Sequence, residues 1–300
     1  MTETVSIIIP TRNRAPVLEL CLNALAHQHT NGYFCNVIVV DDCSSDETQA
    51  VVQASVQSSP FGIELLRQPR SLGANAARNR GLEKSTGDII IFIDDDVLVP
   101  PGWLHRLVKG LREGSHPVTS GAVKLTLDGE YVGKHRCEIG TYLGEILSPP
   151  LGVNGDTVPV LGNMAAYRWV FDRARFDPVI RPPMEECDWM LRAGVTAGFV
   201  PEAWAWHYKT GDELRLRRVL RGSWHRGSEG GWWMRERQRM MFSKRLRLAM
   251  GGIRTCGRAV GHAVLHRCWG GAVIAAGELS RAMSLVGLTN RGRRLPASWR

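Results

Sequence analysis

Apolar residues cluster into four continuous runs in the first hundred positions of the chain. Such runs, rich in β-branched residues and free of polar alternation, are typical of strands buried on both faces of a sheet. Between them, apolar side chains recur at the three- and four-residue spacing of amphipathic helices. The pattern predicts strands over Val5–Pro10, Asn36–Val40, Gly62–Leu66 and Asp88–Ile93, and helices over Ala15–His27, Asp46–Gln57 and Gly73–Lys84.

This alternation of strand and helix predicts an α/β fold with a mainly parallel sheet and helices on both faces. We expect that Rossmann-like domain to occupy residues 1–212, with irregular strands and loops over residues 115–160. From Leu214 onward, Arg, Trp and Met interleave at helical spacing, so residues 213–300 are expected to form a helical appendage.

Polar clusters follow three of the predicted strands. They are Pro10-Thr11-Arg12-Asn13-Arg14, Asp41-Asp42 and Asp94-Asp95-Asp96. In sheets of this kind, ligands bind beyond the carboxyl ends of the strands. We therefore expect the three clusters to converge on one binding rim.

The charge of the chain is unevenly distributed. The net charge is +9, but residues 213–300 hold 19 Lys and Arg against 4 Asp and Glu. Residues 1–212 hold 19 basic and 25 acidic residues. An acidic body with a basic tail suggests two separate tasks.

Cysteine usage and the N-terminal sequence favour a cytoplasmic protein. The seven cysteines are scattered and form no CxxC pair, which argues against a disulfide framework and a zinc site. The N-terminus shows no signal-peptide pattern. The longest apolar stretch, Ala259–Leu279, is interrupted by His262, His266, Arg267 and Glu278, so we expect no spanning helix.

Three adjacent carboxylates at Asp94-Asp95-Asp96 repel one another and suggest a bound cation. Mg²⁺ and Mn²⁺ take carboxylate and diphosphate oxygens together, and can neutralise a departing nucleoside diphosphate. The competing interpretation is a solvated acidic turn before Pro100-Pro101.

Six sequence blocks together resemble family 2 glycosyltransferases with the GT-A fold, of bacterial type. The blocks occur in the expected order between about Val5 and His207. They read VSIIIPTRNR, VIVVDDCSSD, LGANAARNRG, GDIIIFIDDDV, LGNMAAYRWVF and MEECDWMLRAGVTAGFVPEAWAWH.

This resemblance implies a nucleotide-sugar site. The donor-binding positions it implies are Pro10, Thr11, Arg12, Arg14, Asp41 or Asp42, Arg78, Asp94, Asp95 and Asn163. The Mn²⁺ or Mg²⁺ site would use Asp94 and Asp96, with His207 completing the metal shell. A UDP- or dTDP-sugar is favoured, because an aspartate at Asp41 or Asp42 would accept a hydrogen bond from uracil or thymine N3–H. Taken alone, the arginines could be surface cations, Asp41 a turn cap and His207 a core histidine.

The Glu185-Glu186-Cys187-Asp188 segment resembles the family's catalytic-base region. An inverting transfer needs a base on the face opposite the leaving group. The second acid of the family's Glu-Asp pair is Glu186 here, one methylene longer than the usual aspartate. We expect Glu186 to be the base, with Asp188 as the alternative. These acids could also simply stabilise a helix N-terminus.

The basic tail follows Leu214–Arg221 with the interfacial candidates Trp224, Trp232, Trp233, Met234, Met240, Met241 and Phe242. This composition favours an amphipathic helix on the anionic inner face of the cell membrane. Packing on the catalytic domain is the alternative, and no nucleic-acid-binding module is recognised.

The sequence thus predicts an inverting glycosyltransferase acting on an acceptor hydroxyl, in synthesis of cell-surface polysaccharide, glycolipid or natural-product glycoside. A nucleotidyltransferase would need a Gly-rich loop after the first strand, and a dehydrogenase would need GxGxxG there. The rival from another class is a non-catalytic protein of the same fold that docks a membrane or partner.

Overall fold

The computed structural model describes residues 4–30, 32–128, 130–131, 145–150, 157–265 and 269–289. The described chain forms two compact units. The first contains described residues up to 131 together with 145–179 and 185–208, and the second contains 180–184 and 209–289.

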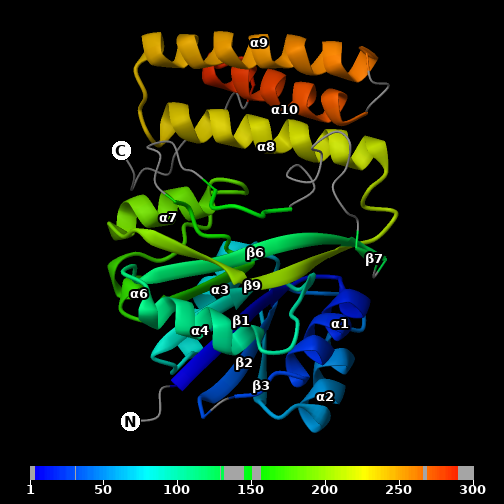
Figure 1. Cartoon of the computed structure of the whole chain (residues 1–300), viewed down its shortest axis with the longest axis vertical. Helices are drawn as coiled ribbons and strands as arrows, with labels where there is room; N and C mark the ends of the chain where they lie inside the picture. The colour runs from blue at the N-terminus through cyan, green and yellow to red at the C-terminus, as the bar shows by residue number, and fades with distance from the viewer. Residues whose placement is uncertain are drawn as a thin grey trace. The chain divides into compact units, whose positions relative to one another are not determined.

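Four parallel strands form one half of the sheet in the first unit (Figure 1). They are β1 (Thr4–Thr11), β2 (Phe34–Asp41), β3 (Gly62–Arg67) and β4 (Ile89–Ile93), in the order β3-β2-β1-β4. Each begins and ends within two residues of its predicted bounds. Strands β1, β2 and β4 are easily read from sequence because helices cover both faces and make nearly every position apolar. Strand β3 lies at the edge of the sheet, has no buried position, and carries Glu64 and Arg67.

Helices cover both faces of this sheet, as predicted. On one face, the hydrophobic core includes residues of α1 (Ala15–Ala26), α2 (Thr48–Ser58) and α4 (Trp103–Glu113). On the other, it includes residues of α3 (Ala74–Lys84), α6 (Val170–Arg173) and α7 (Glu185–Ala193). The α/β fold class is therefore confirmed.

The other half of the sheet is antiparallel, so the whole sheet is mixed. It contains β5 (Val97–Leu98), β6 (Val118–Leu127), β7 (Glu130–Tyr131), β8 (Asn163–Tyr167) and β9 (Ala197–Lys209). The order continues from β4 as β8-β6-β9-β5, with β7 on β6.

The ten-residue strand β6 corrects the expectation of irregular structure over 118–127. Its glycine and hydroxyl residues weaken the apolar pattern, yet eight of the first nine positions, including Thr119 and Ser120, are buried. Gly121 has a packing role here, because a β-carbon at this position would come 1.8 Å from the carbonyl oxygen of Ala203.

We expect Gly121→Ala to destabilise the first unit by roughly 1–3 kcal/mol, the usual cost of overpacking a core. Gly251→Ala is the matched control, because a β-carbon there meets nothing within 4 Å. Urea unfolding of both variants measures the difference. Equal unfolding midpoints in the two variants would show that the close approach of Gly121 to β9 does not matter for the stability of the first unit.

The second unit contains three helices, α8 (Leu216–Glu236), α9 (Phe242–Leu265) and α10 (Trp269–Leu285). Helix α10 packs against both α8 and α9 (Figure 1). Ser223 Oγ donates to Val273 O at 2.7 Å, and Ser284 Oγ donates to Ser228 O at 2.8 Å. Small and hydroxyl residues thus bring α8 and α10 close together.

Two tryptophans of α8 differ from the expectation of an interfacial role. Trp232 and Trp233 are 1% and 0% exposed, whereas Trp224 is partly exposed. Their neighbours Ser228, Glu229, Gly230 and Gly231 are also buried, so this part of α8 is an inner segment. Among the described helices, none is long and apolar enough to cross a bilayer.

Candidate functional site

The three polar clusters converge at the carboxyl ends of β1, β2 and β4. Thr11 Oγ1 donates a hydrogen bond to Asp95 Oδ2 at 2.8 Å. The backbone N–H of Asn13 donates to Ser44 Oγ at 2.9 Å, which ties the loop after β1 to the loop after β2. The expected rim is therefore present.

Each carboxylate of the aspartate cluster contacts a basic side chain. Arg78 Nη2 lies 2.8 Å from Asp94 Oδ1. Arg14 lies 3.0 Å from Asp96 Oδ2 and 3.4 Å from Asp95 Oδ1. Arg14 and Arg78 offset part of the repulsion among these carboxylates, so their proximity alone does not require a bound cation.

Asp95 is a buried member of the aspartate cluster. Burial raises the pKa of Asp95 to about 7, although the nearby Arg14 guanidinium opposes the change. With Thr11 and Arg14 both in contact with it, Asp95 holds the loop after β1 against the cluster.

Asp96 and His207 form an adjacent pair of metal-ligand types. His207 Nε2 lies 3.0 Å from Asp96 Oδ2. The contact is fixed by strand pairing, since Val97 pairs with His207 and Tyr208 N–H donates to Asp96 O at 2.8 Å. Asp96 and His207 are 111 residues apart in the sequence, and the pairing of β5 with β9 brings them together.

The carboxylate of Asp96 and the imidazole of His207 are ligand types that a divalent cation accepts, and phosphate oxygens could fill its remaining coordination positions. Mg²⁺ is often held by one or two protein groups plus substrate phosphates. Within the described residues, no three His, Cys, Asp or Glu side chains are grouped as a metal site. Asp94, expected as a ligand, is bonded instead to Arg78.

Arg78 is a buried cation on α3, not the surface residue that its type alone would suggest. It is 5% exposed and donates from Nη1 to Asn75 Oδ1 at 3.0 Å. Gly162 lies against the same cluster, because a β-carbon there would stand 2.7 Å from Asp94 Oδ2. The glycine leaves room for the Asp94 carboxylate.

Asp41 and Asp42 have different surroundings, although the sequence left them equivalent. Asp42 accepts four hydrogen bonds, from Gln68 Nε2, Ser71 Oγ and the N–H groups of Leu72 and Gly73. It therefore organises the loop before α3.

Asp41 differs from Asp42 because only one of its carboxylate oxygens accepts a hydrogen bond from the described residues. Oδ1 accepts from Ser44 N–H at 2.8 Å, and buried Oδ2 has no hydrogen-bond partner among the described residues. Arg67 Nε lies 3.8 Å from Oδ2. Sequence reasoning missed Arg67, but its place opposite Asp41 follows once the ends of β2 and β3 are aligned.

Asn163, for which the sequence predicts a donor-binding role, has its side chain engaged within the fold. Its side chain is 0% exposed and donates to Ala122 O and Ala203 O, at 3.0 and 2.9 Å. Its carbonyl oxygen accepts from Trp103 Nε1 at 2.8 Å. The Asn163 amide group thus joins β8 to β6 and to β9.

The two candidate bases on α7 differ in their partners. Asp188 is 2% exposed and lies 2.7 Å from Arg192 Nε, one turn along the helix. Glu186 is half-buried, and its pKa is raised well above the usual range by burial and by Glu185. Arg78 opposes that rise and Asp94 adds to it, so Glu186 lies within the electrostatic influence of the donor-side cluster.

The remaining predicted donor-binding residues, Pro10 and Arg12, lie at the end of β1 and in the following loop. Pro10 is buried in the strand, and Arg12 is exposed. Of these two residues, Arg12 is the one whose side chain a ligand could reach from solvent.

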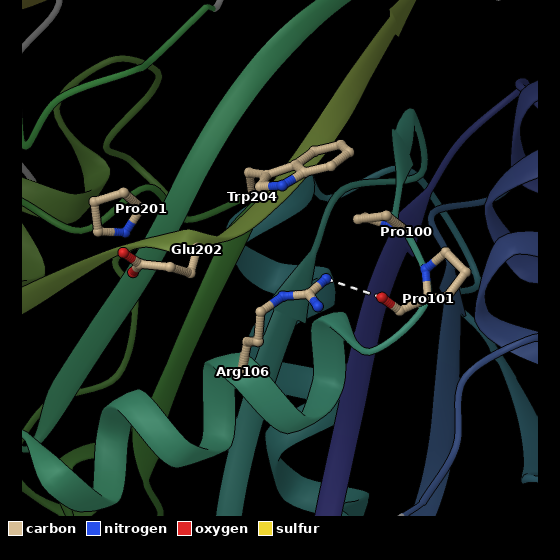
Figure 2. Close-up of a pocket in the computed structure, with 6 residues that line it drawn as sticks. All are labelled: Pro100, Pro101, Arg106, Pro201, Glu202 and Trp204. Atoms are coloured by element: carbon tan, nitrogen blue, oxygen red, sulfur yellow. Dashed lines mark hydrogen bonds between the residues drawn. The ribbon is translucent and has the colours of Figure 1, made fainter.

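A pocket of about 640 Å³ opens beside α4 and β9 (Figure 2). Its lining residues are Pro100, Pro101, Arg106, Pro201, Glu202 and Trp204. Arg106 Nη2 donates to Pro101 O at 2.9 Å across its floor. None of these residues is a predicted site residue, and we assign the pocket no part in the reaction.

Known glycosyltransferases resemble this chain in fold. A mannosyltransferase from Pyrobaculum calidifontis, solved with GDP-Man and Mn²⁺, matches with a TM-score of 0.58 and 20% identity over 76% of this chain and 62% of the other. S. aureus TarS in complex with UDP-GlcNAc matches with a TM-score of 0.53 and 18% identity over 77% and 66%. At these identities the likeness shows the GT-A fold.

Sequence relatives point to the same class. Glycosyltransferase AglE of Haloferax volcanii is 34% identical over 42% of each chain. A Campylobacter jejuni enzyme named GalNAc(5)-diNAcBac-PP-undecaprenol beta-1,3-glucosyltransferase is 36% identical over 36% of this chain and 35% of its own. The matched region spans less than half the length of either relative. The sequence profile of glycosyl transferase family 2 matches residues 6–169, more than half of the chain, and the protein therefore belongs to that family.

Proposed function

We propose that residues 1–212 transfer a sugar from a nucleoside diphosphate sugar to an acceptor hydroxyl, with inversion at the anomeric carbon. The observation that carries the proposal is the position of Glu186, whose pKa responds to both Arg78 and Asp94. The candidate base therefore lies near Arg78 and Asp94, two residues of the proposed donor site.

Asp41 is the group we propose for recognition of the nucleotide base. A buried acceptor oxygen without a hydrogen bond is costly, and a ring N–H would satisfy it. Uracil and thymine present such a donor at N3. Because Arg67 lies beside Oδ2 and its side chain is 45% exposed, we expect Arg67 to move aside when a nucleotide enters.

Asp96 and His207 are the residues we propose to hold Mn²⁺ or Mg²⁺, with diphosphate oxygens completing the coordination. When bound, the ion would neutralise charge on the departing diphosphate. Arg14 and Arg78, already beside the aspartates, would add positive charge on the same side.

Glu186 removes the acceptor proton in the proposed reaction. The acceptor oxygen then forms a bond to the anomeric carbon from the face opposite the diphosphate. The bond from that carbon to the diphosphate oxygen breaks, and its electron pair leaves with the nucleoside diphosphate. Asp188 is the weaker candidate, because its carboxylate is ion-paired with Arg192.

We keep the product class broad, as cell-surface polysaccharide, glycolipid or natural-product glycoside. The Campylobacter relative's name specifies an undecaprenol-linked substrate, and another relative, from Pseudomonas paraeruginosa, is named an undecaprenyl-phosphate 4-deoxy-4-formamido-L-arabinose transferase. These names support a lipid-linked acceptor or carrier, and we propose that the protein meets it at the cytoplasmic face of a membrane.

A panel of nucleoside diphosphates, each with and without Mn²⁺, tests the proposal by thermal shift. A ligand at a hundred times its dissociation constant stabilises the folded state by about 2.7 kcal/mol. We expect UDP or dTDP with Mn²⁺ to give the largest shift, and the matching nucleotide-sugar to be slowly hydrolysed. No shift with any nucleotide would favour the non-catalytic alternative, and a shift without turnover would favour a binding protein that retains the donor site.

Asp41→Asn is expected to weaken UDP binding by about tenfold or more, because a charge-assisted hydrogen bond to the base contributes about 1.5–3 kcal/mol. Calorimetric titration with UDP measures the change. Asp88→Asn is the matched control, since Asp88 lies at the start of β4 and bonds Thr4. Equal affinities in the two variants would remove Asp41 from the base site.

A further inference from the structure

Helix α9 exposes a stripe of large apolar side chains. Phe242, Leu246, Met250, Ile253 and Val260 are between 42% and 59% exposed. At about 100° per residue, these positions fall within about 80° of one another and extend along about 27 Å of helix. They therefore form one continuous surface, which we call the α9 stripe.

The α9 stripe is distinct from the face by which α9 packs on α10. Among the positions of α9 whose burial is described, the buried ones are Ala249, Gly252 and Ala259. Ala249 belongs to a core cluster with Ala282 and Leu285 of α10. Small residues thus make the internal contact, while the large apolar side chains face outward.

Basic residues flank the α9 stripe. Arg247, Arg254 and Arg258 are exposed and lie along one side of it, about 40–80° around the helix from its edge. The sequence Phe242–Leu265 contains no Asp or Glu. Large apolar side chains bordered by cations are the pattern of a helix that lies in the interface of an anionic bilayer.

We propose that the α9 stripe binds the surface of an anionic lipid bilayer, with its apolar side chains inserted and the flanking cations on lipid headgroups. Charge favours this partner over a second copy of the chain, because two α9 helices would bring their cations together. The assignment moves the membrane contact from the tryptophans of α8, two of which are buried, to α9. It does not depend on sugar transfer.

Flotation of the full chain with vesicles tests the proposal. We expect binding to vesicles of mixed phosphatidylglycerol and phosphatidylcholine, and much weaker binding to phosphatidylcholine alone. Ile253→Asn should lower the partition constant by about tenfold or more, because a fully inserted apolar side chain is lost. Thr255→Asn also leaves the net charge unchanged, and Thr255 is exposed but lies outside the α9 stripe. This variant should change the partition constant by less than about twofold.

Four outcomes would overturn the assignment. They are absence of binding to the mixed vesicles, equal binding to both vesicle types, equal losses in the two variants, and a vesicle-free dimer that Ile253→Asn dissociates in sedimentation velocity. Circular dichroism of both variants establishes that α9 remains folded, and Leu246→Asn repeats the stripe test at an independent position. Equal binding to both vesicle types would exclude an anionic surface as the specific partner.

Discussion

Glu186→Gln is expected to lower the rate of sugar transfer by about 10²–10⁴-fold, the usual contribution of a general base. Glutamine keeps the size of the side chain but cannot accept the acceptor proton. Donor binding should stay within about twofold of wild type, because the donor is held by other residues. Transfer from a radiolabelled nucleotide-sugar and calorimetric donor binding give the two numbers.

Asp188→Asn separates the two candidate bases. Asp188 is buried and paired with Arg192 on the same helix, so its loss should lower the melting temperature more than the chemical rate. If Asp188→Asn abolished transfer while Glu186→Gln retained it, the roles would be exchanged. If both variants lost transfer activity while remaining folded, Glu186 and Asp188 would act as a pair.

The pH dependence of transfer gives an independent check on Glu186. A base works only when deprotonated, and burial together with Glu185 raises the pKa of Glu186. Activity should therefore fall, as pH decreases, at a higher pH than an ordinary glutamate would give. The rate left in Glu186→Gln should lack this acidic limb.

The sequence predicted those features that depend on local pattern. Strands β1 to β4 and helices α1 to α3 were identifiable because buried parallel strands and amphipathic helices leave distinct periodicities. Convergence of Thr11, Asp41 and Asp94 also followed, since parallel strands place their carboxyl ends on one edge. The family resemblance then named the chemistry.

Features set by long-range pairing were not predictable in the same way. The sequence showed three adjacent aspartates, but not that Arg14 and Arg78 would neutralise them from other elements. Asn163 has the residue type of a ligand-binding group, yet its amide is used between strands. Trp232 and Trp233 are likewise interfacial by type and buried by position.

Asp96→Asn is expected to lower the Mn²⁺-dependent part of nucleoside diphosphate affinity by at least about tenfold, the lower end of what loss of a supporting group at a metal site costs. Asparagine keeps the shape of Asp96 but weakens its attraction for a cation. Affinity measured without metal should change little. Calorimetric titration with UDP, in Mn²⁺ and in chelator, measures both.

Asp88→Asn controls for loss of one negative charge, because Asp88 lies at the opposite end of β4 from the aspartate cluster. His207→Ala should reproduce the effect of Asp96→Asn, since His207 Nε2 lies 3.0 Å from Asp96 Oδ2. If both variants kept their metal dependence, the ion would be held through Asp94 after release from Arg78. If Asp96→Asn lost affinity equally with and without metal, Asp96 would serve mainly to hold Arg14 in place, and the electrostatic support of the diphosphate would come from the arginines alone.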